Sequence, residues 1–272
     1  MVVFDEGNTI VKALDFPQPT AWLATQLAHD PDLWNRWWAI RELSRRTSDS
    51  LAGRALATAA TSADYALTRA QAATALARFP ASLAGAALET ARRDSSAHVR
   101  EAAMVSLGYL GGADALAAAR ESMSDSSYAV QAAAIAVLIR LDPANRASLI
   151  ARGLATESYR DVIRNEALDA IARLGDPAYT ATVDSLRGVS PRAANTLAVL
   201  AVRGDSSALS ALVGALDDAR PYVREWSLHA LAQLPAELRD PSLRAIASSL
   251  RDAKTRTAVD ALLNPTPLPG RR

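Results

Sequence analysis

Catalytic and metal sites are usually built from histidine, cysteine, activated serine and paired carboxylates. The chain has three histidines, His29, His98 and His229, and none has a second ligand at the spacing of a zinc site. Cysteine is absent, which excludes thiolate metal sites, disulfides and a catalytic thiol. There is no G-x-S-x-G elbow and no G-x-x-x-x-G-K-[ST] or G-x-G-x-x-G phosphate-binding run. We therefore predict no catalytic residue, no metal ligand and no cofactor in this chain.

Arginine recurs about every 31 residues along the chain. Two of the eight repeated positions hold another residue, Gln131 in one repeat and Asn195 in another. A row of arginine side chains could bind an acidic partner or the carboxylate of a peptide. It could also pair with acids or helix carbonyls of neighbouring repeats, which we favour because the two substitutions interrupt the row. The arginines are Arg36, Arg69, Arg100, Arg164, Arg224 and Arg256.

Large aromatic residues gather near the N-terminus. Trp34, Trp37 and Trp38 are spaced to share one face of a helix, Trp22 lies on the preceding predicted helix, and Phe16 comes just before it. We favour a core that closes the first repeat. The alternative is a docking surface for another domain, because large aromatics are enriched at interfaces.

The residues that follow each arginine repeat as well. Val99-Arg100 precedes Ala103 and Leu107, and the same V-R-x-x-A-x-x-x-L pattern recurs every 29 to 33 residues. The small and large residues three and seven places after the arginine lie on one helical face, which must be buried. The pattern resembles HEAT repeats. It predicts an all-α fold, an α-α superhelix of about eight helix pairs over residues 18–264.

Glycine and proline mark the predicted helix ends. The run from Gly108 to Gly112 and the run Gly175-Asp176-Pro177 predict two stops, and Pro241 predicts a start or a turn. The degenerate repeat at Asn195 places Ala198 and Val202 on the buried face.

Residues 1–17 lie outside the repeat. Two apolar runs flank Glu6-Gly7-Asn8, which predicts a short N-terminal β-hairpin. The hairpin could fold back on the first helices as a cap. Alternatively, it is the remnant of an upstream β-sandwich, because an isolated hairpin is marginal in water. Residues 265–272 are rich in proline and predicted to be disordered.

The run from Val3 to Phe16, with Phe4-Asp5-Glu6-Gly7-Asn8 at its centre, resembles the segment that leaves the β-sandwich of alanyl-aminopeptidase-like zinc metallopeptidases of the M1 family. The resemblance continues from Leu23 to Leu43. It implies that this chain is the helical C-terminal domain of such an enzyme, covering the catalytic cleft and limiting the entry of peptides. Its partners would then be the upstream catalytic and β-sandwich domains, and zinc would be held in the catalytic domain. The family's H-E-x-x-H motif is absent here.

The net charge and the length of the apolar runs argue against some classes of partner. Thirty basic residues balance 29 acidic ones, which argues against a nucleic-acid partner. No apolar run is long enough for a membrane span, and the acidic N-terminus does not resemble a signal peptide. The other functions that we consider are a stand-alone scaffold that binds a protein or peptide, and a HEAT-fold lyase or DNA glycosylase.

Overall fold

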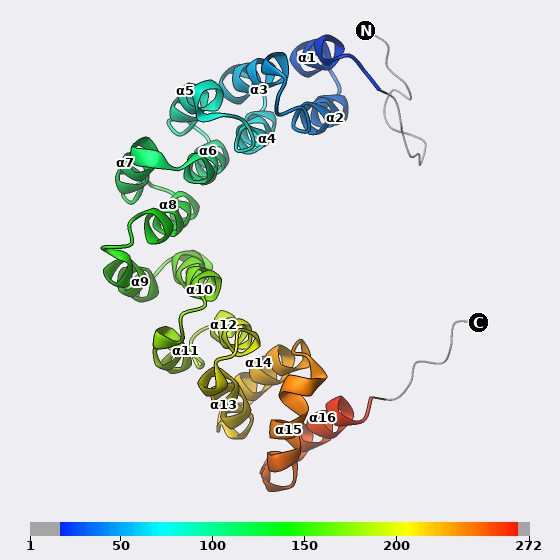
Figure 1. Ribbon diagram of the computed structural model, residues 1–272, viewed down its shortest axis with the longest axis vertical. Coiled ribbons are helices and arrows are strands. Elements are labelled where there is room, and N and C mark those ends of the chain that lie inside the picture. Colours follow the sequence, from blue (N-terminus) through cyan, green and yellow to red (C-terminus); the bar gives the residue numbers. More distant parts are fainter. Residues whose placement is uncertain (1–16, 266–272) are drawn as a thin grey trace, which may run out of the picture. The chain divides into compact units, whose positions relative to one another are not determined.

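The computed structural model describes residues 17–265, and every regular element within this range is helical. Sixteen α-helices follow one another along the chain in eight pairs (Figure 1). The predicted all-α repeat is therefore confirmed. The predicted hairpin and tail fall on residues 1–16 and 266–272, outside the described residues, and so does Phe16. No helix among residues 17–265 combines the length and the apolar character that a membrane span requires.

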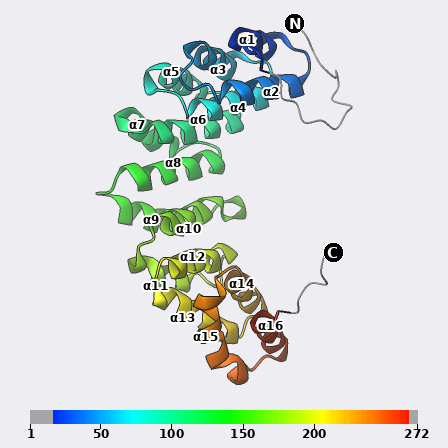
Figure 2. The same cartoon turned by 45° about the vertical axis from the view of Figure 1, so that its right-hand side comes forward.

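The helices gather in two compact units, and the chain passes from the first to the second between Gly153 and Leu154. In the first unit, the odd-numbered helices α1, α3, α5 and α7 form one row and the even-numbered helices α2, α4, α6 and α8 form the other (Figures 1 and 2). The helices that begin in this unit are α1 (Thr20–His29), α2 (Leu33–Leu43), α3 (Ser50–Ser62), α4 (Ala66–Leu76), α5 (Ala81–Ala91), α6 (Ala97–Leu110), α7 (Gly112–Ser122), α8 (Tyr128–Leu141) and α9 (Arg146–Ala155).

The core of the first unit follows the repeat. The alanine three places after the repeated position is fully buried in each even-numbered helix, and a buried leucine follows it one turn later. Alanine favours the helix and lets neighbouring helices approach closely, while leucine supplies most of the buried apolar area. The eight residues are Ala39, Leu43, Ala72, Leu76, Ala103, Leu107, Ala134 and Leu138.

Gly108 differs from its prediction as part of a helix stop. It lies inside α6 and is buried, and the helix continues to Leu110 before Gly111 ends it with a φ of 73°. A Cβ atom at Gly108 would lie 2.4 Å from Cγ2 of Val137 on α8. The residue is therefore a close-packing point between two helices, because only a glycine leaves room for the β-branched side chain opposite.

The second unit continues the alternation with shorter helices and several 3₁₀ turns. Gly175 ends α10 in the left-handed conformation, as the sequence predicts. The elements are 3₁₀ turn η1 (Tyr159–Asp161), α10 (Val162–Leu174), η2 (Pro177–Tyr179), α11 (Thr180–Ser185), α12 (Pro191–Val202), α13 (Ser206–Gly214), η3 (Ala215–Asp217), α14 (Pro221–Ala232), α15 (Ala236–Ile246), η4 (Ala247–Ser249) and α16 (Ala253–Leu263).

Two sequence predictions in the second unit are wrong. Ala198 is buried as predicted, but Val202 is 56% exposed, because Leu197 and Ala201 lie at the centre of the buried face of α12. The degenerate repeat was thus aligned out of register with the true buried face. Pro241 lies inside α15 rather than at a helix start.

Candidate functional site

Three of the predicted aromatic residues come together on α2. Asp32 caps this helix by accepting a hydrogen bond from the backbone N–H of Trp34 at 2.8 Å. The rings of Trp34 and Trp37 lie 4.7 Å apart between centroids, in a tilted arrangement. Trp38 is partly buried against the core, whereas Trp34 is 50% exposed. On this helix Trp38 therefore packs against the core, while Trp34 faces solvent.

Arg41 completes this group. Its guanidinium carbon lies 5.8 Å from the ring centroid of Trp37 and 5.6 Å from that of Trp38, within the range of a cation–π interaction. We call Trp34, Trp37, Trp38 and Arg41 the aromatic cluster. Leu33, 41% exposed, extends its apolar surface at the start of the helix.

Trp22 stands apart from the aromatic cluster. It is 55% exposed near the start of α1, and residues 17–265 show no ring contact between it and the other tryptophans. Nearby, Arg46 donates hydrogen bonds to Thr20 Oγ1 at 2.7 Å and to the carbonyl of Gln18 at 2.6 Å. These bonds fix the point where the chain enters the first helix, beside Trp22.

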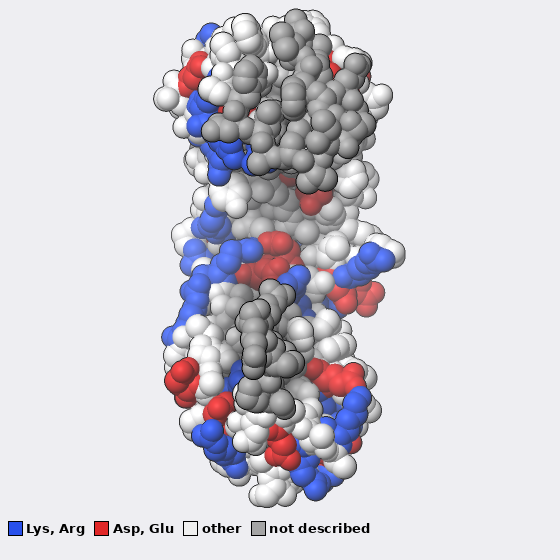
Figure 3. Space-filling view, turned by 90° about the vertical axis from the view of Figure 1, so that its right-hand side faces the viewer, with Lys and Arg blue, Asp and Glu red and all other residues white. Residues whose placement is uncertain are grey.

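The histidines show no arrangement for chemistry. His29, His98 and His229 are all exposed. Within the described residues there is no group of three or more histidine, cysteine, aspartate or glutamate residues that could hold a metal ion. Both basic and acidic side chains are visible in Figure 3, with basic side chains along much of the left edge and a group of acidic side chains near the middle.

The repeated arginines are engaged inside the protein. Arg100 donates from Nε and Nη2 to the two carboxylate oxygens of Asp125, both at 2.8 Å, and from Nη1 to the carbonyls of Asp94 and Ser95 at 3.0 and 3.1 Å. Arg69 binds Asp94 in the same way, at 2.7 and 2.9 Å. We call each such arginine, with the aspartate of the next helix pair, a rung.

Each aspartate of these two rungs has a second role. Asp125 Oδ1 also accepts from the backbone N–H of Ser127 at 2.8 Å, at the start of α8, and Asp94 does the same for Ser96. The hydrogen bonds from Arg100 and Arg69 hold the pKa of Asp125 and of Asp94, respectively, below the usual value. Each of these carboxylates thus binds both the start of the helix that follows it and the arginine of the preceding helix pair.

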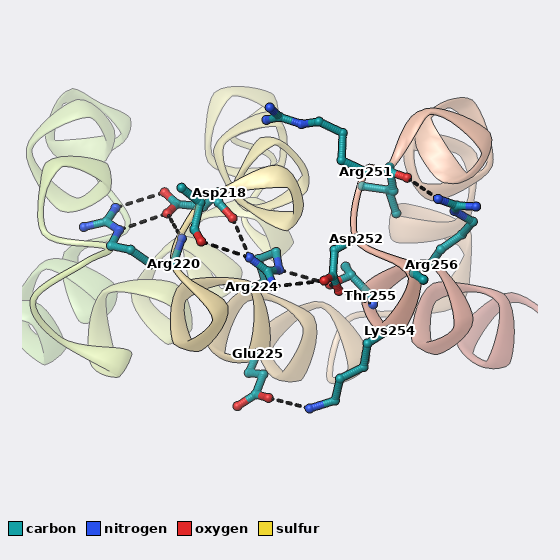
Figure 4. Close-up of polar contacts among 12 residues, drawn as sticks. Asp218, Arg220, Arg224, Glu225, Arg251, Asp252, Lys254, Thr255 and Arg256 are labelled. Carbon is teal, nitrogen blue, oxygen red and sulfur yellow. Dashed lines mark hydrogen bonds and ion pairs between the residues drawn. The ribbon is translucent and has the colours of Figure 1, made fainter.

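A similar rung occurs in the second unit. Arg224 lies between the carbonyl of Asp218, which accepts from Nη1 at 2.8 Å, and the carboxylate of Asp252, which accepts from Nη2 at 3.2 Å (Figure 4). Asp252 also accepts from the N–H of Thr255 near the start of α16, at 2.8 Å. The pattern is therefore a recurring structural device, and these guanidinium groups are not available to a partner.

The remaining repeated positions make only part of a rung. Gln131 reaches the carbonyl of Asp125 at 2.6 Å, Arg256 reaches that of Leu250 at 2.8 Å, and Asn195 is half-buried. Arg164 donates to the carbonyl of Leu154 at 2.9 Å and pairs with Asp161 at the start of its own helix. Arg36 is treated below.

The rungs predict how stability depends on pH. A carboxyl group whose pKa is lower in the folded than in the unfolded chain stabilises the fold above about pH 4, and this contribution is lost as the pH falls further. We expect the free energy of unfolding to decrease more steeply below about pH 4 in the wild type than in an Asp94→Asn, Asp125→Asn variant. Urea unfolding at a series of pH values between 2 and 6 would measure the two slopes. Equal slopes would contradict the assignment.

Comparison with known proteins agrees with this geometry. Residues 84–172 match the HEAT repeats family. A search of curated protein sequences finds no match. Among solved structures, the YibA protein of Escherichia coli is similar at 18% identity with a TM-score of 0.54, covering 92% of this chain and 93% of that one.

Two other structures share the fold. The complex of CpcE and CpcF of phycocyanin lyase from Nostoc sp. PCC7120 is similar at 18% identity with a TM-score of 0.51, covering 93% of this chain and 97% of that one. Kap121p bound to Nup53p is similar at 13% identity with a TM-score of 0.53, covering 89% of this chain and 32% of that one. At these identities the similarity concerns the fold alone. Residues 17–265 thus form a HEAT-type helical repeat.

Proposed function

We propose that this chain is a non-catalytic helical-repeat domain that docks on another protein domain through its first helix pair. The observation that carries the proposal is the exposed aromatic cluster on α2, because exposed tryptophan and arginine side chains are typical of interface centres. The rungs support this proposal indirectly. Most of the repeated arginines are paired inside the protein, so they do not need an acidic partner to explain them.

The partner that we propose is the β-sandwich and catalytic domain of an M1-type zinc aminopeptidase, encoded upstream in the same reading frame. Support comes from the resemblance of residues 3–16 to the segment that joins those domains in the family, and from the bonds of Arg46 that hold Gln18 beside Trp22. In that setting the helical repeat covers the catalytic cleft and limits which peptides enter. On this proposal the boundaries are a connecting segment at 1–17, a helical repeat at 18–264 and a tail at 265–272.

The first test is genetic. The natural reading frame that contains this sequence is extended upstream and searched for H-E-x-x-H before a β-rich stretch. We expect to find it. A stop codon shortly before Met1, with no such segment, would overturn the aminopeptidase proposal while leaving the docking surface open.

The second test measures the contact itself, in the longer protein. Hydrogen exchange of the α2 amides should be slower there than in the 272-residue chain. Trp34→Ser should remove this added protection. Tyr222→Ser is the matched control, because Tyr222 occupies the equivalent place on α14 and is 41% exposed. Equal α2 exchange in the two proteins would contradict docking through this helix.

A second candidate function is a stand-alone scaffold that binds a protein or peptide along the even-numbered helices of the first unit. Exposed apolar side chains on these helices favour it: Leu67 on α4 is 66% exposed, Tyr109 on α6 69% and Tyr128 on α8 45%. A photo-crosslinking residue at position 109 should capture one stoichiometric partner, whereas one at Ala117 on α7 should not. Capture at both positions, or at neither, would contradict this candidate.

A further inference from the structure

A cavity of about 360 Å³ opens between α1 and α3 in the first unit. Its walls are small or apolar, with Leu27 and Ala28 from α1 and Leu51 and Ala55 from α3. The cavity is large enough for a small organic ligand and too small for a folded segment.

One end of the cavity is charged. Arg36, which reaches it from α2, is only 9% exposed, and Asp64 and Arg54 lie at the same cavity. Arg54 is exposed and donates from Nη1 to Ser50 Oγ at 3.1 Å. The cavity lining as a whole thus holds two guanidinium groups and one carboxylate, a net positive charge that favours an anion.

Arg36 occupies the position of a rung arginine, yet its rung is incomplete. Its Nε donates to the carbonyl of Asp30 at 2.5 Å. Asp94 and Asp125 stand six residues before Arg100 and Gln131, but Ala63 occupies that place before Arg69. Asp64 lies one residue later, and its Oδ2 forms an ion pair with Nη1 of Arg36 at 4.0 Å, beyond hydrogen-bond distance. In the complete rung of Arg69 and Asp94 the two bonds measure 2.7 and 2.9 Å.

The local structure explains why this rung stays open. Asp94 and Asp125 are each held by the N–H two residues later, whereas Ala63, at the corresponding position before α4, has no carboxylate. The side chain of Asp64 is 82% exposed. The side chain of Arg36, 11% exposed, therefore lines a cavity in which no carboxylate from residues 17–265 lies within hydrogen-bond distance of Nη1 or Nη2. Burying such a group without its partner is unfavourable, and a ligand carboxylate would supply that partner.

We propose that this cavity binds a carboxylate that carries a short aliphatic chain. The carboxylate accepts hydrogen bonds from Nη1 and Nη2 of Arg36, because Nε is bound to the carbonyl of Asp30; in the complete rungs Asp94 and Asp125 accept from Nε and Nη2 instead. The aliphatic chain lies against Leu27, Leu51 and Ala55. The last residue of a peptide and a free carboxylic acid both have this chemistry.

The test is calorimetric titration of the full 272-residue chain with N-acetyl-leucine, N-acetyl-leucinamide and hexanoate. N-acetyl-leucine should bind at least ten times more tightly than its amide, because only the acid can pair with Arg36. Tighter binding of N-acetyl-leucine than of hexanoate indicates a peptide end, and the reverse order indicates a free carboxylic acid.

Four variants locate the site. Arg36→Gln should weaken binding at least tenfold, whereas Arg100→Gln should not change it, because Arg100 is paired with Asp125 and does not line the cavity. Asp64→Asn should tighten binding severalfold by removing a competing negative charge. Thr58→Phe should abolish binding without lowering Tm, because Thr58 is exposed on α3 and lines the cavity.

The proposal fails if the acid and the amide bind equally, if neither binds saturably, or if Thr58→Phe binds as the wild type does. Should Arg36→Gln not fold, the comparison of acid with amide and the Thr58→Phe variant still decide the question.

Discussion

Replacing Arg100 by leucine is expected to lower the free energy of unfolding by about 3 kcal/mol, because it leaves a largely buried carboxylate without its partner. The side chains of Arg100 and Asp125 are only 15% and 14% exposed. The substitution also leaves the carbonyls of Asp94 and Ser95 without the donor that now binds them.

The control is Arg251→Leu, which removes an ion pair of similar length in an exposed place. Arg251 lies 2.7 Å from Asp217, but their side chains are 78% and 38% exposed. We expect a loss below about 1 kcal/mol. Urea unfolding should be followed by circular dichroism, because the helices of both units contribute to that signal, whereas four of the five tryptophans lie on α1 and α2 of the first unit. Equal losses for the two variants would mean that the rungs contribute no more than surface pairs.

Ala134→Leu is expected to destabilise the first unit by about 3 kcal/mol through overpacking. Ala134 is fully buried at the close approach of α8 to its neighbours, and a leucine adds three carbon atoms that have no space. Ala117→Leu is the control, because Ala117 is exposed on α7 and its change should stay within about 0.5 kcal/mol. Thermal unfolding of both variants measures the difference, and a stable Ala134→Leu protein would show that the helices can move apart there.

The fold could be predicted from the sequence because each repeat shows the same pattern of buried residues. A buried alanine and a buried leucine recur at fixed offsets, so one irregular copy does not obscure the pattern. The register of that irregular copy was predicted wrongly at Val202, since α12 lacks the repeated arginine that marks the position elsewhere. Gly108 was misread for another reason. A glycine that ends a helix and a glycine that admits Val137 from another helix cannot be distinguished without knowing which residue lies opposite.

The candidate sites were less predictable than the fold. The spacing of Trp34, Trp37 and Trp38 predicts a shared face, and they do lie together, but the separation of Trp22 depends on how α1 packs against α2. The engagement of the arginines by acids of the next helix pair agrees with the favoured interpretation. The open rung at Arg36 has a signal in the sequence, because Ala63 stands six residues before Arg69, where Asp94 and Asp125 stand before Arg100 and Gln131.

The spacing of the complete rungs bears on how such a protein can change in length. Arg69 and Asp94, like Arg100 and Asp125, are 25 residues apart, and the two arginines are separated by one full period of the repeat. Duplicating or deleting one whole period therefore recreates an arginine and an aspartate at the same separation. A gene encoding this fold can therefore gain or lose one of these helix pairs in a single event, and the new junction keeps the ion pair.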